Sequence, residues 1–308
     1  MKKILVIKHG SLGDIISSTS VINDIKNHYK NSKIFILTTD KYKFFFSNSL
    51  FFDEILIDNR SSFFSILIMI KKIINLKFDL IIDLQNSQRT SFYALLFRLF
   101  SKIKINGTGF FSSHRYKYSS NNLPSVINGL SNQIEIMGIN TTRKIFIDWL
   151  NDQSFDFNNL PNKNFFIINP GCSKKNNQKR WPADNYAEVC SFLLSKNILP
   201  IVIGLNEDVD AIKKIVQKES NILNLLNKSS LSTILQLSLK AIGAISNDTG
   251  PAHLIAASGC KIHLILSNFS NTKTVIPQGT NVTFTQKNNI KDISVDGVLI
   301  EIKRIFKI

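Results

Sequence analysis

Three loops of this 308-residue sequence carry side chains that could bind or react with a ligand. The first, at residues 9–14, holds the acid Asp14, and the second, at residues 170–182, holds a group of cations. The third, at residues 246–253, reads Ser-Asn-Asp-Thr-Gly-Pro-Ala-His. Each follows a run typical of a buried strand and precedes a helical pattern. Ligands bind beside the carboxyl ends of strands in open α/β sheets, so these loops are the candidate sites.

The third loop combines a tight turn with the start of a helix. The apolar residues 241–245 predict a buried strand, and Asp248 to Pro251 predicts a turn that leads into a helix. Gly259 is typical of a helix end, and residues 261–266 predict the next strand. Backbone N–H groups and the positive end of the helix dipole meet at such a start, which suits a phosphate or diphosphate. A plain turn with Asp248 or Thr249 as the helix N-cap is the alternative.

The second loop suits a diphosphate whose negative charge grows as a bond to it breaks. It contains Gly171, Ser173 and four cations, Lys174, Lys175, Lys179 and Arg180. A solvated lysine run is the alternative, and it applies best to Lys174 and Lys175 because lysine is abundant throughout the chain. Lys179 and Arg180 are the stronger donor-binding candidates, since the following Trp-Pro pair would hold the end of the loop.

The first loop offers Asp14 as its single acid. It lacks the full G-x-G-x-x-G pattern, so a nicotinamide enzyme is poorly supported. Asp14 could be a catalytic base or a helix N-cap, and a helix start stabilises the ionised carboxylate, which weakens a base unless burial offsets the effect. A fourth candidate is Glu207, which follows a strand and could bond a ribose hydroxyl. Its alternative is a first-turn acid favoured by the helix dipole.

Composition fits a globular protein with anionic partners. The chain is 44% hydrophobic with a mean hydropathy of +0.03, and its net charge of +16 (pI about 9.7) suggests nucleotide phosphates, anionic lipid or nucleic acid. The basic residues are dispersed, which is also typical of a solvated surface. Three cysteines without paired or metal-type spacing, and five histidines without a ligand pattern, predict a reduced cytoplasmic setting and no metal. The apolar run at the N-terminus is too short for a signal peptide, and residues 66–70 fall far below a membrane span, so any membrane contact would be peripheral.

The remaining pattern predicts two Rossmann-like domains facing a cleft. Strands and helices alternate through residues 1–150, the pattern fades into Asn, Asp, Gln and Pro between 148 and 164, and a second alternation fills residues 164–290. A terminal helix is expected within residues 291–308. The expected strands are 3–8, 33–38, 53–57, 79–84, 104–107, 164–169, 199–204, 222–225, 241–245 and 261–266. The expected helices include 15–29, 63–74, 91–100, 126–137, 183–196, 207–217 and 231–239.

Three motifs together resemble the ADP-heptose–lipopolysaccharide heptosyltransferases, which form glycosyltransferase family 9 and have the GT-B fold. They are Leu12-Gly13-Asp14 after an N-terminal strand, Lys179-Arg180-Trp181-Pro182 after a Pro-Gly loop, and Asn247-Asp248-Thr249-Gly250-x-x-His253. Their order and spacing extend over nearly the whole chain. The sequence departs from the family in having Ser20 where a proline is frequent, and in the long Asn/Lys-rich insert before Lys179.

The resemblance implies an acceptor-binding N-terminal domain and a C-terminal domain for the nucleotide sugar. Asp14 would be the general base, Lys179 would stabilise the leaving diphosphate, and His253 belongs to the third motif, where packing beneath the loop is its expected role. The donor-binding set is Ser173, Lys179, Arg180, Glu207, Asp248, Thr249, Gly250 and His253. The acceptor-binding candidates are Gly13, Arg89 and Arg115.

The expected activity is an inverting, metal-independent transfer of heptose from ADP-heptose to a lipopolysaccharide core or lipid A-type acceptor, with no cofactor. The enzyme would work in the cytoplasm, with peripheral contact to the inner membrane left open. Two alternatives also stay open at this point. One is a GT-B transferase that uses another nucleotide sugar, and the other is a non-catalytic nucleotide- or nucleic-acid-binding protein. No helix-turn-helix, RNP-like or zinc-finger pattern supports nucleic-acid binding.

Overall fold

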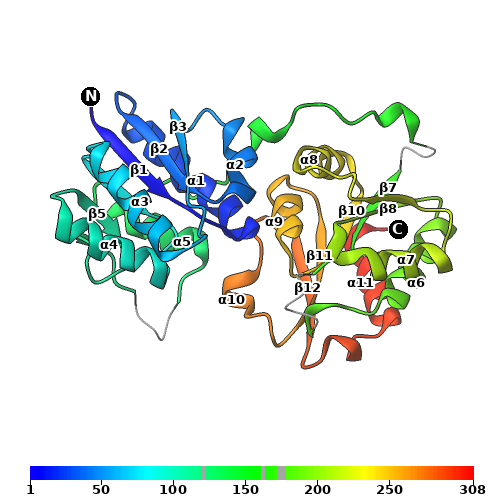
Figure 1. Ribbon diagram of the computed structural model, residues 1–308. Coiled ribbons are helices and arrows are strands. Elements are labelled where there is room, and N and C mark those ends of the chain that lie inside the picture. The colour runs from blue at the N-terminus through cyan, green and yellow to red at the C-terminus, as the bar shows by residue number, and fades with distance from the viewer. Residues whose placement is uncertain (119–122, 161–163, 173–177) are drawn as a thin grey trace. The chain divides into compact units, whose positions relative to one another are not determined.

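The computed structural model describes residues 1–118, 123–160, 164–172 and 178–308. The chain divides into two compact units, an N-terminal unit (Met1–Trp149) and a C-terminal unit (Leu150–Ile308). Each unit is a parallel sheet with helices on its faces (Figure 1). No helix in these described ranges is long and apolar enough to cross a membrane.

The N-terminal sheet has the strand order β3-β2-β1-β4-β5-β6, with every pair parallel. The order reverses between β1 and β4, and this reversal creates the switch point where open α/β sheets bind ligands. Leu5 at the centre of β1 lies opposite Phe35 on β2 and Ile81 on β4. The strands are β1 (Lys3–Ile7), β2 (Lys33–Thr38), β3 (Glu54–Ile57), β4 (Leu80–Asp83), β5 (Lys104–Gly107) and β6 (His114–Arg115).

Helices cover both faces of this sheet because its strands are apolar on both sides. Leu5 and Ile7 belong to a core cluster with Ile70 and Phe97, so the helices that carry these two residues share one face. Helices α1 and α5 pack against each other. The helices are α1 (Leu12–His28), α2 (Asp40–Ser47), α3 (Phe63–Asn75), α4 (Gln88–Phe100) and α5 (Val126–Glu135).

The C-terminal sheet repeats the same topology, with the strand order β12-β11-β10-β7-β8-β9. Its switch point lies between β7 and β10, where Ile168 pairs with Ile245. The five residues of each of these two strands are buried, as expected for central strands covered on both faces. The strands are β7 (Phe165–Asn169), β8 (Leu199–Gly204), β9 (Leu223–Leu226), β10 (Gly243–Asn247), β11 (Ile262–Ser267) and β12 (Val282–Lys287).

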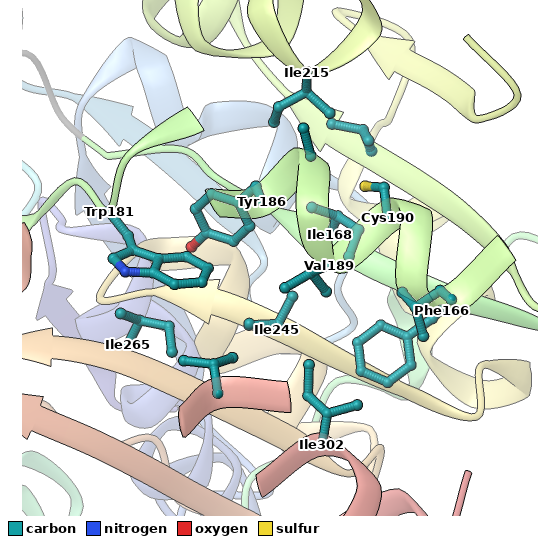
Figure 2. Close-up of a cluster of buried hydrophobic side chains, with 14 of the residues drawn as sticks. Phe166, Ile168, Trp181, Tyr186, Val189, Cys190, Ile215, Ile245, Ile265 and Ile302 are labelled. Atoms are coloured by element: carbon teal, nitrogen blue, oxygen red, sulfur yellow. The ribbon is translucent and has the colours of Figure 1, made fainter. Parts of the chain in front are cut away.

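The core of the C-terminal unit contains Trp181, which is fully buried (Figure 2). Its ring meets Tyr186 edge to face with the centroids 5.0 Å apart, and its indole N–H donates to the Ile293 carbonyl at 2.9 Å. The tryptophan therefore ties the end of the 170–182 loop to the sheet and to the C-terminal segment. The helices are α6 (Ala183–Ser195), α7 (Val209–Lys218), α8 (Leu231–Lys240), α9 (Gly250–Ala257), α10 (Thr272–Val275) and α11 (Val295–Phe306). Short 3-10 turns lie at η1 (Asp148–Leu150), η2 (Phe157–Asn159), η4 (Asn206–Asp208) and η5 (Ile290–Asp292).

Most expected elements form within a few residues of their predicted bounds, and the differences have local causes. Helix α4 begins at Gln88 rather than at residue 91, because the Ser87 hydroxyl accepts the Thr90 N–H at 3.2 Å and caps the helix earlier. The sequence pattern missed α2 and the half-exposed edge strand β12. The suggested linker also packs into the C-terminal unit, where the Phe155 N–H donates to the Gln236 side chain at 2.9 Å.

Candidate active site

The switch point of the C-terminal sheet brings a helix start beside two strand ends. Strand β7 ends at Asn169, whose amide donates to the hydroxyls of Ser246 and Thr249 at 2.8 and 3.0 Å. Thr249 occupies the N-cap position of α9, which opens with Gly250 and a proline in its first turn. The first backbone N–H groups of a helix have no partner within the helix, so this start can bind an anion.

An ion pair places a cation next to this helix start. Lys179 Nζ lies 2.7 Å from Asp248 Oδ2, and the Ser270 hydroxyl donates to the same carboxylate oxygen at 2.8 Å. The two charged side chains are only 18% and 12% exposed. Asp248 immediately precedes Thr249, so the structure brings together four of the predicted donor-binding residues: Lys179, Asp248, Thr249 and Gly250.

Arg180 has a different set of contacts from its neighbour Lys179. Its guanidinium donates to the carbonyls of Pro170 and Cys172 at 3.3 and 2.5 Å and forms an ion pair of 2.9 Å with Asp208. These bonds fasten the start of the 170–182 loop to the segment that follows β8. The Arg180 side chain therefore stabilises the conformation of the loop. Its predicted contact with a nucleotide-sugar donor stays a prediction.

Sequence reasoning missed two buried polar residues that shape this loop. Asp208 accepts the backbone N–H groups of Cys172 and Leu205 at 3.2 and 3.1 Å. A Cβ atom on Gly171 would lie 2.7 Å from an Asp208 carboxylate oxygen, so only glycine fits there. The Asn247 side chain accepts from the backbone N–H of Trp181 and the Tyr186 hydroxyl, and it donates to the carbonyls of Pro170 and Gly171. The signal that could have pointed to Asn247 was its position, because it is a polar residue at the end of an otherwise apolar strand.

The other predicted donor-binding residues lie around the same switch point or outside the described residues. Glu207 is exposed on η4, and its carbonyl accepts a bond from Arg180 at 3.4 Å. His253 is half-buried near the start of α9. Ser173 lies outside the residues that the structure describes, so its predicted contact has no geometry here.

In the N-terminal unit, Asp14 sits in the first turn of α1 beside the switch point. Its Oδ2 accepts both the backbone N–H and the hydroxyl of Ser11 at 3.2 Å. Ser11, rather than Asp14, occupies the N-cap position, and the predicted acceptor-binding Gly13 is buried within the same turn. Gly10 has a φ of +134°, and a Cβ there would lie 2.6 Å from the Tyr42 ring, so glycine alone suits this position. The half-buried Asp14 carboxylate is thus held in one orientation at the carboxyl end of β1.

Lys8 is a functional candidate that the sequence reasoning did not identify. Lys8 directly follows β1, is 3% exposed, and donates through Nζ to the Leu84 carbonyl at 3.1 Å. Burial lowers the pKa of Lys8, and the negative charges of Asp14 and Asp83 act in the opposite direction. Burial also raises the pKa of Asp83, at the end of β4. A buried lysine therefore lies at the N-terminal switch point, within electrostatic reach of Asp14.

Arg89 belongs to a compact charged cluster around the buried carboxylate of Asp58. That carboxylate accepts the Tyr93 hydroxyl at 2.7 Å and Arg89 Nη2 at 3.2 Å, and Arg60 Nε lies 3.5 Å away. Although burial raises the pKa of Asp58, these hydrogen bonds lower it overall. His9 Nε2 lies 3.7 Å from Asp58, but burial and the nearby arginines lower the pKa of His9 to about 3, so the imidazole is neutral.

Arg115, the third predicted acceptor-binding residue, has its own partners. Its Nε donates to the Thr108 carbonyl at 3.1 Å, and its guanidinium carbon lies 5.6 Å from the centre of the exposed Phe110 ring. Arg115 is exposed at the end of β6. The structure therefore shows Arg89 and Arg115 with different partners in the same unit.

Comparison with known proteins identifies the family to which the chain belongs. The family model of glycosyltransferase family 9 (heptosyltransferase) matches residues 66–262, well over half of the chain. The chain belongs to glycosyltransferase family 9. It is therefore a glycosyltransferase, and its two Rossmann-like units are those of the GT-B fold. The fold and family predicted from the three motifs are confirmed.

Individual relatives agree with this assignment. The chain is 29% identical over 283 residues to lipooligosaccharide heptosyltransferase 2 of Campylobacter jejuni, a match that covers 88% of this chain and 82% of the relative. The crystal structure of a family 9 glycosyltransferase from Veillonella parvula superimposes with a TM-score of 0.82 at 18% identity, covering 99% and 97% of the two chains. E. coli heptosyltransferase WaaC with ADP-2-deoxy-2-fluoro heptose superimposes with a TM-score of 0.76 at 16% identity, covering 98% and 99%.

Proposed function

We propose that this glycosyltransferase moves heptose from ADP-heptose to the inner core of a lipopolysaccharide or lipooligosaccharide, with inversion at the anomeric carbon and without a metal. The observation that carries the proposal is the Lys179–Asp248 ion pair beside the start of α9 at the C-terminal switch point. The proposed donor class is supported by the solved relative with an ADP-heptose analogue, and the proposed acceptor class by the name of the Campylobacter jejuni relative.

The donor half of the mechanism uses the start of helix α9 and the Lys179 ammonium at the C-terminal switch point. The diphosphate would accept backbone N–H groups at the start of α9, where the helix dipole favours negative charge. Asp248 and Ser270 hold Lys179 in position, so its ammonium can approach a phosphate oxygen with little reorganisation. These groups stabilise the charge that grows on ADP as the bond from the anomeric carbon to the phosphate oxygen breaks. We propose that these groups stabilise the leaving diphosphate, as a bound metal ion does in other transferases.

The acceptor half of the mechanism uses Asp14 as the general base. The acceptor hydroxyl oxygen would attack the anomeric carbon from the face opposite the diphosphate, and its proton would pass to the Asp14 carboxylate. One displacement of this kind inverts the configuration at the anomeric carbon. The bonds from Ser11 orient the carboxylate before the acceptor arrives. We propose that Gly13, Arg89 and Arg115 contribute to acceptor binding, with the two arginines attracting anionic groups.

A transfer assay with purified components tests this function. We expect the enzyme to add one heptose to an inner-core glycolipid from ADP-heptose in the presence of a metal chelator, with the product detected by mass spectrometry. The anomeric configuration of the product, read by NMR, should be opposite to that of the donor. Transfer from a UDP-hexose but not from ADP-heptose would refute the donor assignment, and a retained configuration would refute the single displacement.

We propose that this reaction takes place in the cytoplasm, at the face of the inner membrane where a lipid-anchored acceptor would be presented. The proposal is supported by the lipooligosaccharide in the name of the Campylobacter jejuni relative. A lipid-anchored acceptor restricts the enzyme to a membrane surface while it works. Fractionation of cells that contain the tagged enzyme, with and without the acceptor, would test this location: recovery of the enzyme with the outer membrane would refute it.

A further inference from the structure

Helix α3 exposes large apolar side chains on the face that points away from its sheet. Its inward positions, Ile66, Met69, Ile70 and Ile73, are buried in the N-terminal core. Its outward positions include Phe64 and Ile68, which are 74% and 70% exposed. Exposed apolar residues scattered singly are ordinary, whereas a run of them along one helix is a mark of an interaction site.

The same outward stripe ends in cations. The positions Phe64, Leu67, Ile68, Lys71 and Lys72 follow the spacing of one helix face, and all five are exposed. The first two turns of the stripe are therefore apolar, and the next turn carries two ammonium groups. Long lysine side chains can lay their methylene stems along an apolar layer while the charge stays in water.

The neighbouring helix α4 extends this surface. The two helices pack together (Figure 1). The rings of Phe63 on α3 and Phe92 on α4 lie with their centroids 6.3 Å apart. At its other end α4 exposes Leu99 and Phe100. We call the exposed side chains of these two helices, Phe63, Phe64, Leu67, Ile68, Leu99 and Phe100, the α3–α4 surface.

The charge of this surface is of one sign. Residues 59–78 contain no Asp or Glu, and neither do residues 84–134. The same two segments contain ten cations: Arg60, Lys71, Lys72, Lys77, Arg89, Arg98, Lys102, Lys104, Arg115 and Lys117. Asp58 pairs with Arg60 and Arg89, but neither α3 nor α4 carries an acid that could neutralise Lys71, Lys72 or Arg98. The occupant of the α3–α4 surface must therefore offer an apolar layer together with negative charge.

We propose that the α3–α4 surface docks the enzyme on an anionic lipid membrane. The apolar side chains of α3 would enter the boundary between headgroups and acyl chains, and Lys71 and Lys72 would pair with lipid phosphates. This inference rests on the proposed function, because a lipid-anchored acceptor has to be met at a membrane surface. The inference adds which part of the chain meets the membrane, the α3–α4 surface, and which kind of lipid that surface binds.

Vesicle flotation of the full-length enzyme tests the docking surface directly. The probes are vesicles of phosphatidylethanolamine with phosphatidylglycerol, and vesicles of phosphatidylcholine alone. The variant Phe64→Glu/Ile68→Glu removes the apolar stripe, and Lys71→Ala/Lys72→Ala removes its charge. The matched control, Leu239→Glu/Ile300→Glu, changes two apolar side chains of the C-terminal unit that are 52% and 62% exposed. Circular dichroism and the unfolding midpoint confirm that each variant is folded.

We expect the wild type and the control to float with the anionic vesicles and to bind phosphatidylcholine weakly. Phe64→Glu/Ile68→Glu should weaken partitioning into anionic vesicles roughly tenfold or more, because each apolar side chain loses its transfer free energy. Lys71→Ala/Lys72→Ala should weaken it roughly fivefold per lysine and reduce its dependence on salt. Flotation of Phe64→Glu/Ile68→Glu at the wild-type level would overturn the proposal. So would a wild-type dimer that this variant converts to monomers, since a second copy would then cover the surface.

Transfer to a water-soluble, deacylated acceptor separates this inference from the proposed function. We expect Phe64→Glu/Ile68→Glu to transfer heptose to that acceptor at the wild-type rate and to lose activity only on acceptor embedded in vesicles. Normal transfer by an enzyme that does not bind vesicles would refute the docking surface and leave the proposed function intact. Vesicle binding without any heptose transfer would refute the proposed function and support the docking surface.

Discussion

Replacement of Asn247 by alanine should destabilise the C-terminal unit more than any single contact of this residue would suggest. Asn247 is fully buried, and its side chain makes four hydrogen bonds with other described residues. Its Oδ1 accepts the backbone N–H of Trp181 at 3.2 Å and the Tyr186 hydroxyl at 2.9 Å, and its Nδ2 donates to the carbonyls of Pro170 and Gly171 at 2.8 and 3.2 Å. One side chain thus joins the end of β10 to both ends of the 170–182 loop.

The size of the effect follows from the donors that alanine leaves without an acceptor. The backbone N–H of Trp181 and the Tyr186 hydroxyl both lose their acceptor, Asn247 Oδ1. A buried polar group without a partner costs about 1–3 kcal/mol. Asn247→Ala should therefore lower the free energy of unfolding by roughly 3–5 kcal/mol, a large part of the 5–15 kcal/mol that is usual for a domain. Tyr186→Phe removes one donor and leaves Oδ1 bonded to Trp181, so it should cost about 1 kcal/mol.

Urea unfolding followed by tryptophan fluorescence measures this difference. Trp181 is the single tryptophan of the C-terminal unit, and Trp149→Phe removes the other one, so the signal reports on the unit that holds Asn247. We expect Asn247→Ala/Tyr186→Phe to be more stable than Asn247→Ala, because the second change removes an orphaned hydroxyl. A cost for Asn247→Ala no larger than that of Tyr186→Phe, or a double variant less stable than Asn247→Ala, would refute the reasoning.

Three further predictions concern the reacting groups and pH. Asp14→Asn should lower kcat about 10²–10⁴-fold, as expected for loss of a general base, and leave the Kd for ADP unchanged by calorimetry. Lys179→Met should lower kcat about 10²–10³-fold and also weaken ADP binding, because it removes the positive charge that stabilises the leaving diphosphate. Burial lowers the pKa of His263 to about 4, whereas the unfolded chain keeps the ordinary value of 6.5. The unfolded chain therefore binds the proton first, and stability should be lost as pH falls from 6.5 towards 4, by roughly 3 kcal/mol. Urea unfolding of the wild type and His263→Gln should show that the variant loses less stability over this range.

Each of these predictions has an outcome that contradicts it. Full activity of Asp14→Asn would remove this residue from the reaction, and weaker ADP binding by it would move Asp14 to the donor site. Unchanged ADP binding by Lys179→Met would place the diphosphate away from the Lys179–Asp248 pair. An equal loss of stability in acid for the wild type and His263→Gln would show that another group binds the proton on unfolding.

The sequence predicted the elements that follow from strong apolar periodicity and missed those that do not. The alternation of buried strands and amphipathic helices, and the three loops at strand ends, were readable because they depend on local pattern alone. Helix α2 carries three consecutive phenylalanines without helical spacing, and β12 is a half-exposed edge strand with polar residues. Neither has the periodicity that would reveal it.

The candidate site was only partly readable because distant residues complete it. Lys179 and Asp248 lie 69 positions apart, so each motif could suggest a charge but not their ion pair. Arg180 is a second example: its charge suggested a donor contact, which stays a prediction, but the sequence could not show that its guanidinium also bonds the start of the 170–182 loop and Asp208. Lys8 was overlooked because a lysine at the end of a strand is usually solvated, whereas here the neighbouring strand end buries it.

A crystal structure of the chain with ADP tests the central claim, the donor site at the start of α9, more directly than any other measurement. We predict that the diphosphate oxygens lie within hydrogen-bond distance of backbone N–H groups at Thr249 and Gly250 and of Lys179 Nζ. ADP whose diphosphate lies away from the β7–β10 switch point, or ADP bound in the N-terminal unit, would contradict the claim.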